Sequence, residues 1–306
     1  MTAKPRLTWL LRWLVSAGLL AWILTRPELA QLGPQLRRMN PAWLLGGLLC
    51  AGLSLAISAW RWQACLRALG MDVPLGRLCQ ISLAAAAAGC FSFGALGTDL
   101  AKVLLIGPHL PGRHGAILSS LALDHTSALP CVVLMVTAAV LSHGGMPVAS
   151  TPGAWVLLTA AVLALAAIGL VSWKFRRFHL EIVRVLADRA TWRGFAIAVW
   201  RSVPKWIAYC GIFYCAARAC GVVLPVAGFA GVIAIADGVA ALPVTIAGLG
   251  VREQAFQSLL GKWYGVAPAA AVALSLTGFA LTLGWAAVGA VCVGGASVKP
   301  EEIIIP

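Results

Sequence analysis

The chain has 306 residues, of which 61% are hydrophobic and 11% are charged, and its mean hydropathy is +0.91. Soluble domains are about 45–50% apolar and about 25% charged, so this composition excludes an ordinary soluble protein and indicates an integral membrane protein. The net charge of +13 does not indicate a nucleic-acid partner, because the Lys and Arg residues punctuate apolar runs instead of alternating with aromatic residues on a polar segment. We expect these residues to set membrane topology and to contact anionic lipid.

The chain begins with "MTAKPRLTWLLRWLVSAGLLAWILTRPE", a basic start followed by an apolar run. A secretory signal peptide has this outline, but the run lacks a small-x-small cleavage site and is interrupted by Arg12. We interpret it as a retained first membrane helix.

Several later apolar runs reach about 20 residues, the length that crosses the hydrocarbon core as a helix. The alternating pattern of an outer-membrane barrel is absent from the sequence. We therefore predict an all-α, polytopic membrane protein with one transmembrane domain over residues 1–306. Two more apolar segments, 78–106 and 225–261, are interrupted by glycine and charge. The predicted full spans are 8–25, 42–66, 115–142, 153–173, 194–217 and 267–293.

The distribution of Lys and Arg between the spans predicts the orientation. A cytoplasmic N-terminus places most of them on the inside, so we expect a multi-pass protein of the bacterial inner membrane with both termini in the cytoplasm. The largest basic cluster is "KFRRFHLEIVRVLADRATWR", residues 174–193. Two interpretations of this segment stay open, an amphipathic helix on the inner leaflet and a solvated loop.

Two segments of the chain resemble each other. "RALGMDVPLGRLCQISLAAAAAGCFSFGALGTDLAK" begins at Arg67, and "RACGVVLPVAGFAGVIAIADGVAALPVTIAGLGVRE" begins at Arg218. Each opens with Arg-Ala-x-Gly-x-x-x-Pro, continues with small apolar residues and ends in a Leu-Gly step followed by charge. The offset is 218 − 67 = 151 at the start and 250 − 97 = 153 at the glycines Gly97 and Gly250. We infer an internal duplication, with halves of about 42–142 and 194–293.

Three predicted spans separate the two copies, and an odd number means that the copies face opposite sides of the membrane. An inverted-topology repeat with interrupted helices at matching positions points to a transporter-like site near the bilayer midplane. Unwound backbone is tolerated at that depth only where it lines a cavity or is buried in protein. We therefore predict about six full spans plus two re-entrant helical hairpins.

The first break carries Gly97, Thr98, Asp99 and then Lys102. Thr98 or Asp99 is expected to cap the returning half-helix, and Asp99 lies at i, i+3 from Lys102.

The second break carries Gly248 and Gly250, followed by Arg252 and Glu253. The free amides of a half-helix that starts there suit a phosphate or carboxylate, and an arginine beside them can clamp an anion.

With "PVTIAGLGVRE", "GALGTDLAK" and "LALDHTSAL", the chain resembles the lysylphosphatidylglycerol synthase transmembrane-region family over nearly its whole length. The resemblance implies a lipid flippase-like protein, and some stand-alone relatives are tied to hopanoid synthesis. The family usually has two glycines and an acid with a later arginine at the first break, where this chain has Gly-Thr-Asp and Lys102. It often has an acid–arginine pair in the next helix, where this chain has Asp124 and His125. The soluble lysyl-transferase domain of the fused relatives is absent from this sequence, so the resemblance does not imply lysyl-lipid synthesis.

Asp124 is predicted to lie about ten residues, near 15 Å, inside its span. An acid at that depth requires a partner, for which His125 and Lys102 are the candidates, and its role is either functional or a structural link between helices. Asp237, inside the second interrupted segment, either serves a cavity or bonds to Arg252 or a backbone amide.

Arg201 and Lys205 share a helix face; snorkelling to the surface accounts for Arg201 better than for Lys205, which is a candidate headgroup contact. We expect Arg61, Arg67 and Arg77 to mark the cytoplasmic edge. The nine cysteines lie mostly in apolar segments and are interpreted as small buried hydrophobes rather than as disulfides or metal ligands. The candidate substrate-binding residues are Asp99, Lys102, Asp124, Lys205, Asp237, Gly248, Gly250, Arg252 and Glu253.

The predicted function is a lipid flippase or translocator of lipid-linked substrates that moves an anionic or zwitterionic amphiphile through a midplane cavity. A membrane phospholipid or a polyprenyl- or hopanoid-type lipid is the expected partner, and a homodimer is left open. The sequence shows no catalytic constellation, nucleotide-binding loop or metal-ligand cluster, so we expect no enzyme activity, no catalytic residues, no metal and no cofactor. Two alternatives stay open: a membrane-embedded lipid-carrier transferase and a scaffold in lipid biosynthesis.

Overall fold

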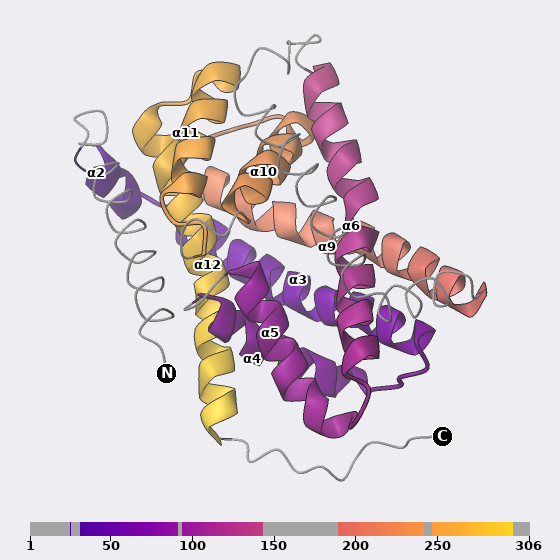
Figure 1. The fold of residues 1–306 in the computed structure, drawn as a ribbon. Helices are drawn as coiled ribbons and strands as arrows, with labels where there is room; N and C mark the ends of the chain where they lie inside the picture. The colour runs from indigo at the N-terminus through magenta and orange to yellow at the C-terminus, as the bar shows by residue number, and fades with distance from the viewer. Residues whose placement is uncertain (1–24, 26–30, 91–93, 143–188, 242–246, 296–306) are drawn as a thin grey trace, which may run out of the picture.

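The computed structural model describes residues 25, 31–90, 94–142, 189–241 and 247–295, and every regular element in these ranges is helical. Residues 8–24 of the first predicted span, the predicted span 153–173 and most of the basic segment 174–193 lie outside them. The elements are α2 (Leu32–Arg37), α3 (Pro41–Ala68), α4 (Leu75–Cys90), α5 (Ala95–Ile106), the 3₁₀ turn η2 (Gly107–His109), α6 (His114–Ser142), α9 (Arg189–Ala219), α10 (Val226–Ala240), α11 (Val251–Tyr264) and α12 (Pro268–Gly295) (Figure 1).

Three of the described helices, α3, α6 and α12, are long and apolar enough to cross a membrane. Their positions agree with three of the predicted spans, which confirms a helical membrane protein. The predicted span 194–217 is also one continuous helix, α9, but α9 is not among these three candidates. It carries several cations, including Arg201 and Lys205, which lower its mean hydropathy.

Each interrupted segment consists of two short helices on either side of a break, as the glycine and charge pattern predicts. The helices α4 and α5 pack against each other, and so do α10 and α11 (Figure 1). The position of the first break was predicted incorrectly. The N-cap of α5 is Gly94, with φ of +59°, three residues before Gly97, and the helix starts at Ala95.

This earlier start removes the predicted caps of α5. Thr98 lies inside the helix, where its Oγ1 donates to the carbonyl of Gly94 at 3.1 Å, and no side chain caps the helix start. A glycine is needed at position 94, because L residues avoid its backbone conformation. The sequence contains several glycines near this point, and only the packing selects one of them.

The repeated Arg-Ala-x-Gly motif forms the same helix end twice. Gly70 and Gly221 both have positive φ, at +69° and +75°. The amide of the residue after each glycine donates to a carbonyl five residues earlier, at 3.0 Å after Gly70 and at 2.9 Å after Gly221. This is the Schellman arrangement, in which a left-handed glycine closes the last turn of a helix. The motif therefore ends α3 and α9 in the same way.

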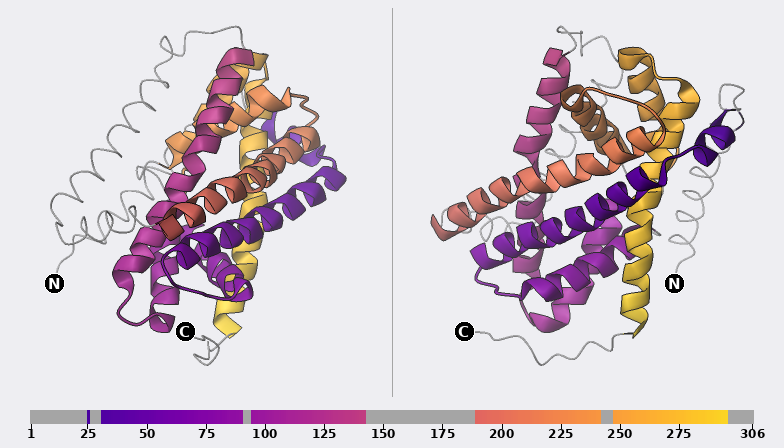
Figure 2. Two further views of the ribbon diagram at one scale, coloured as in Figure 1. Left: turned by 90° about the vertical axis from the view of Figure 1, so that its right-hand side faces the viewer. Right: turned by 180° about the vertical axis from the view of Figure 1, so that it is seen from behind.

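The long helices α3 and α9 lie side by side and run in opposite directions (Figure 2). The amide of Asn40 before α3 donates to the carbonyl of Ala219 at the end of α9, and Thr191 at the start of α9 donates to Ala68 at the end of α3. Around this pair the packing is reciprocal, because α6 contacts α10 and α12 contacts α4. The helices α6 and α12 also run in opposite directions (Figure 1).

Candidate functional site

The two breaks lie next to each other. A methyl group added to Gly94 would lie 3.6 Å from the Cα of Ala247, which is ordinary van der Waals contact. Both residues have positive φ, +59° for Gly94 and +51° for Ala247. Among the described residues, Ala247 is the non-glycine residue with positive φ. This conformation costs of order 1–3 kcal/mol and persists only where the surrounding structure imposes it. Two backbone segments with positive φ, far apart in sequence, therefore lie side by side.

Glu253 fastens the start of α11. Its Oε2 accepts a hydrogen bond from the amide of Gly250, the N-cap residue, at 2.6 Å, and its Oε1 accepts one from Oγ of Ser275 at 3.0 Å. The side chain is fully buried. An acid at the third helical position that returns to the N-cap amide is one half of a capping box. The structure therefore gives Glu253 a defined role in holding the break and tying it to α12.

The two glycines of the second break have different constraints. Gly248 has φ of +75°, and a Cβ there would overlap Ala240 at the end of α10. Gly250 has φ of +86° and is the N-cap of α11. Both positions require a left-handed backbone, and position 248 also has no room for a side chain.

Arg252 lies in the first turn of α11, where its guanidinium faces three groups. Its Nη2 donates to the carbonyl of Ala247 at 3.3 Å and lies 3.9 Å from Oδ1 of Asp237, and its Cζ is 5.4 Å from the ring centroid of Phe279. Its Nε is buried and has no hydrogen-bond partner among the described residues. A guanidinium has five N–H donors, so most of its donor capacity is unused by these contacts.

The acid opposite Arg252 is held from α9. Tyr209 donates its hydroxyl to Oδ1 of Asp237 at 2.7 Å. The ammonium of Lys205, one turn earlier on α9, lies 4.5 Å from the Tyr209 ring and 4.0 Å from the Trp206 ring, within the range of cation–π attraction. Lys205, Tyr209, Asp237 and Arg252 therefore form a polar row from α9 to the second break.

Asp124 does not pair with either of its predicted partners. It accepts two hydrogen bonds from Arg61 of α3, at 2.7 and 2.8 Å, and both side chains are buried. Arg61 also donates to Ser202 of α9 at 3.4 Å. Arg61, which was predicted to mark the cytoplasmic edge, is buried between helices and neutralises the buried acid.

The remaining predicted ion pair, between Asp99 and Lys102, is replaced by other contacts. Asp99 accepts from Nε2 of His125 at 2.6 Å. Lys102 is buried, and its ammonium lies 5.0 Å from the centroid of the Trp62 ring. The Lys102 side chain therefore faces α3, whereas the Asp99 side chain faces α6.

The family model of the lysylphosphatidylglycerol synthase transmembrane region matches residues 9–289. The chain belongs to this family. A comparison with curated proteins finds no match. Family membership indicates a lipid-related function in a membrane.

In this family member the candidate residues fall into two groups. Lys205, Asp237 and Arg252 belong to the polar row, and Gly248, Gly250 and Glu253 build the break beside it. Asp99, Lys102 and Asp124 lie around α5 and α6, where each has its own partner. Sequence reasoning missed Arg61, Tyr209, Trp206 and Ser275 as partners. The position of Arg61, six residues before Arg67 in an apolar run, was the one available signal that it lies deeper than the helix end.

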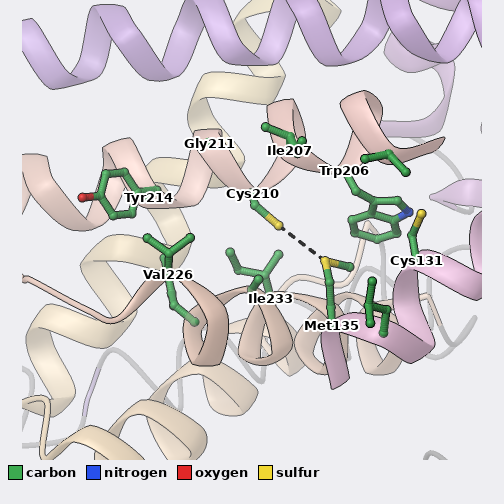
Figure 3. A pocket seen from close by; sticks show the side chains of 13 residues that line it. Cys131, Met135, Trp206, Ile207, Cys210, Gly211, Tyr214, Val226 and Ile233 are labelled. Carbon is green, nitrogen blue, oxygen red and sulfur yellow. Dashed lines mark hydrogen bonds between the residues drawn. The ribbon is translucent and has the colours of Figure 1, made fainter. Parts of the chain in front are cut away.

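The described part of this family member also shows an apolar pocket of about 420 Å³ between α6, α9 and α10 (Figure 3). None of the nine candidate residues lines it. The eight cysteines with described side chains are unpaired, and within the described ranges no three His, Cys, Asp or Glu residues form a group that could hold a metal ion.

Proposed function

We propose that this protein is a lipid flippase of the bacterial inner membrane, which moves an anionic or zwitterionic amphiphile between leaflets along the junction of the two breaks. The observation that carries the proposal is the proximity of Gly94 and Ala247, because it brings two interrupted helices to one place. Irregular backbone at membrane depth is tolerated only where it lines a cavity or is buried in protein, and transporters use it for binding. The family's connection with membrane lipids supports a lipid as the substrate.

An inverted repeat is part of this proposal, and three features support it. The motifs at Arg67 and Arg218 form identical helix ends, and the corresponding helices α3 and α9 run antiparallel. In the repeat, α6 corresponds to α12 and α10 corresponds to α4. The contact of α6 with α10 therefore has a counterpart in the contact of α12 with α4. A two-fold axis in the membrane plane would produce these relations, with α4–α5 and α10–α11 as hairpins entering from opposite sides and both termini in the cytoplasm.

Arg252 is the proposed anchor for the headgroup. Its guanidinium is at the start of α11, and its buried Nε has no hydrogen-bond partner among the described residues. Asp237 lies 3.9 Å away, longer than a hydrogen bond, so a phosphate can compete for the guanidinium with two short parallel bonds. The hydroxyl of Tyr209 would then retain Asp237 on the α9 side.

The proposal assigns no catalytic step to this chain. A lipid-carrier transferase would need a base or nucleophile beside an activated donor, whereas the acids of the described region are engaged by Arg61, His125, Tyr209, Arg67 and the Gly250 amide. A scaffold would bind partner proteins without moving lipid. Translocation by the purified protein alone separates the flippase from both alternatives.

The experiment reconstitutes the purified protein in phosphatidylcholine vesicles that contain a fluorescent phosphatidylglycerol or phosphatidylethanolamine, and measures transfer between leaflets by chemical quenching. Native mass spectrometry counts co-purified lipid. Arg252→Ala and Arg252→Gln should lose translocation and bound lipid, whereas Arg252→Lys should be partly defective because it keeps the charge and loses the planar fork.

The matched control is Arg201→Ala, which removes a guanidinium from α9 that lies over Trp60 and donates to its carbonyl. Its translocation rate should stay near that of the unmodified protein. Normal rates for a folded Arg252→Ala protein would show that Arg252 is structural, and the headgroup assignment would pass to Lys205 and Lys102. No translocation by the unmodified protein with any of these lipids would reject the flippase proposal for them.

A further inference from the structure

The apolar pocket has a buried floor and an exposed rim. The floor includes Trp206, Phe229 and Ile233, which are 8%, 2% and 1% exposed. The rim includes Leu134 at 69% and Ile207 at 69% exposure, so the pocket opens onto an apolar surface. Figure 3 shows side chains of α6, α9 and α10 surrounding it, with the Cys210 thiol directed at the Met135 sulfur, 3.8 Å away. The mouth of the pocket is therefore bordered by exposed apolar side chains.

A void of this kind in a membrane protein requires an apolar occupant. A pocket of about 420 Å³ is within the size range of ligand sites. Water does not fill apolar cavities, and an empty void forfeits the dispersion contacts of its walls. In a bilayer the flexible apolar group available in quantity is a lipid chain. A lipid chain gains no hydrophobic free energy when it moves from the bilayer into the pocket. The pocket therefore contributes van der Waals contacts and a fixed position for the chain.

The pocket and the polar row are connected by the contact of Trp206 with Lys205. Trp206 forms part of the floor, and the Lys205 ammonium lies 4.0 Å from its ring centroid. From Lys205 the row continues through Tyr209 to Asp237 and Arg252. An amphiphile with its chain in the pocket would thus have cationic groups next to the wall of that pocket, which suits an anionic head.

The equivalent crevice in the other half is filled by protein. Trp285 of α12 packs on Gly52 of α3 so closely that a Cβ there would overlap the indole, and its Nε1 donates to the carbonyl of Leu48 at 2.8 Å. Counted from its helix start, Trp285 matches Cys131 of α6, since 285 − 268 = 131 − 114 = 17. The repeat offset matches Gly52 with Val203, since 52 + 151 = 203. Cys131 and Val203 both line the open pocket.

We propose that the pocket between α6, α9 and α10 holds one hydrocarbon chain of the lipid whose head the polar row binds. This assignment rests on the proposed function and adds to it the binding site of the lipid's hydrocarbon chain. One crevice is plugged by an indole and its counterpart is open, so the tail site is asymmetric between the halves.

The test uses phosphatidylcholine vesicles that contain phosphatidylglycerol with a diazirine at the end of one acyl chain. After illumination, peptide mass spectrometry locates the label. We expect label on Phe229 and Ile233 of the unmodified protein above the level at Val288, an exposed residue of α12. Excess unlabelled phosphatidylglycerol should remove that label more effectively than a neutral diacylglycerol, because the head also binds.

The plug is then rebuilt in the open pocket with the double substitution Cys131→Trp and Val203→Gly. It should abolish both the label on Phe229 and Ile233 and lipid translocation. The matched control is Val133→Trp, which places an indole on the same helix at a 62% exposed residue that does not line the pocket. It should leave label and translocation unchanged.

Three results would overturn the tail site: floor label no higher than at Val288, label that persists in a folded plugged protein, or unchanged translocation by that protein. A cross-link from a photoreactive residue at Ile207 to another copy, or to another segment of this chain, would also overturn it, because protein would then occupy the pocket. Floor label without any translocation by the unmodified protein would reject the proposed function and retain the tail site.

Discussion

Asp124 of α6 receives two hydrogen bonds from one guanidinium, that of Arg61 in α3, at 2.7 and 2.8 Å. Both groups are buried, so removing one leaves the other as an unpaired charge. We expect Arg61→Ala or Asp124→Ala to destabilise the protein by about 3–5 kcal/mol. The measurement is thermal unfolding in detergent, analysed as a double-mutant cycle.

The control is the exposed pair of Arg67 and Asp72, whose side chains are 52% and 63% exposed. Its removal should cost about 1 kcal/mol or less. Equal losses for the two pairs would show that burial does not determine the effect. If Arg61→Met with Asp124→Leu restores stability but not translocation, the pair has a functional role beyond structure.

Glu253→Ala should loosen the start of α11. The change leaves the Gly250 amide and the Ser275 hydroxyl without their acceptor, at a cost of about 1–3 kcal/mol. Glu253→Gln keeps one acceptor oxygen and should cost less. Hydrogen exchange at the Gly250 amide measures the cap directly. A Gln variant with normal exchange and bound lipid but no translocation would assign Glu253 a coupling role in addition.

Gly248→Ala should disrupt the second break more than Gly70→Ala disrupts the end of α3. Both glycines have positive φ, but a Cβ at 248 overlaps Ala240, whereas a Cβ at 70 has open space around it. The strain of a left-handed alanine, of order 1–2 kcal/mol, is common to both variants. Their difference in melting temperature and in lipid translocation therefore reports the packing of the break. Equal effects would show that only backbone strain matters.

The proposed inverted topology places residues 109 and 262 on opposite sides of the membrane. His109→Cys and Lys262→Cys, each introduced into a cysteine-free protein, should react with an impermeant maleimide from opposite faces of intact vesicles. Labelling of both from one face would contradict opposite entry of the two hairpins.

The contact of His109 with Arg77 predicts a pH effect. Both Nη2 and Nε of Arg77 lie within hydrogen-bond distance of the His109 Nε2, at 2.7 and 3.2 Å, and burial together with the nearby guanidinium lowers the pKa of His109. The unfolded chain then binds a proton more readily than the folded protein. The stability from this contact is full above about pH 6.5 and falls as the pH drops through and below it. Thermal unfolding in buffers from neutral to mildly acidic pH should show a smaller pH dependence for His109→Asn, and equal pH dependence would refute this origin.

The sequence predicted those features that depend on local pattern. Apolar length predicted α3, α6 and α12, and glycine next to charge predicted that both interrupted segments break. The break at Gly94 was placed three residues late, because several neighbouring glycines satisfy the same local rule. The partners of Asp124 and Asp99 could not be predicted, because they come from other helices and depend on tertiary packing. The substrate-binding roles of the nine candidate residues remain predictions.

The seam between α3 and α9 bears on how such a protein could change shape. A side chain at Gly47 or Gly211 would press on the opposite helix, and one at Gly194 would overlap Ala68. Backbones this close, joined by hydrogen bonds at both ends, cannot separate or slide by a turn without breaking contacts along their whole length. We therefore expect α3 and α9 to move as one rigid unit. In the proposed flippase, alternating access would move α4–α5 and α10–α11 relative to this pair. A disulfide between α3 and α9 should leave transport intact, whereas a disulfide between α4–α5 and α10–α11 should stop it.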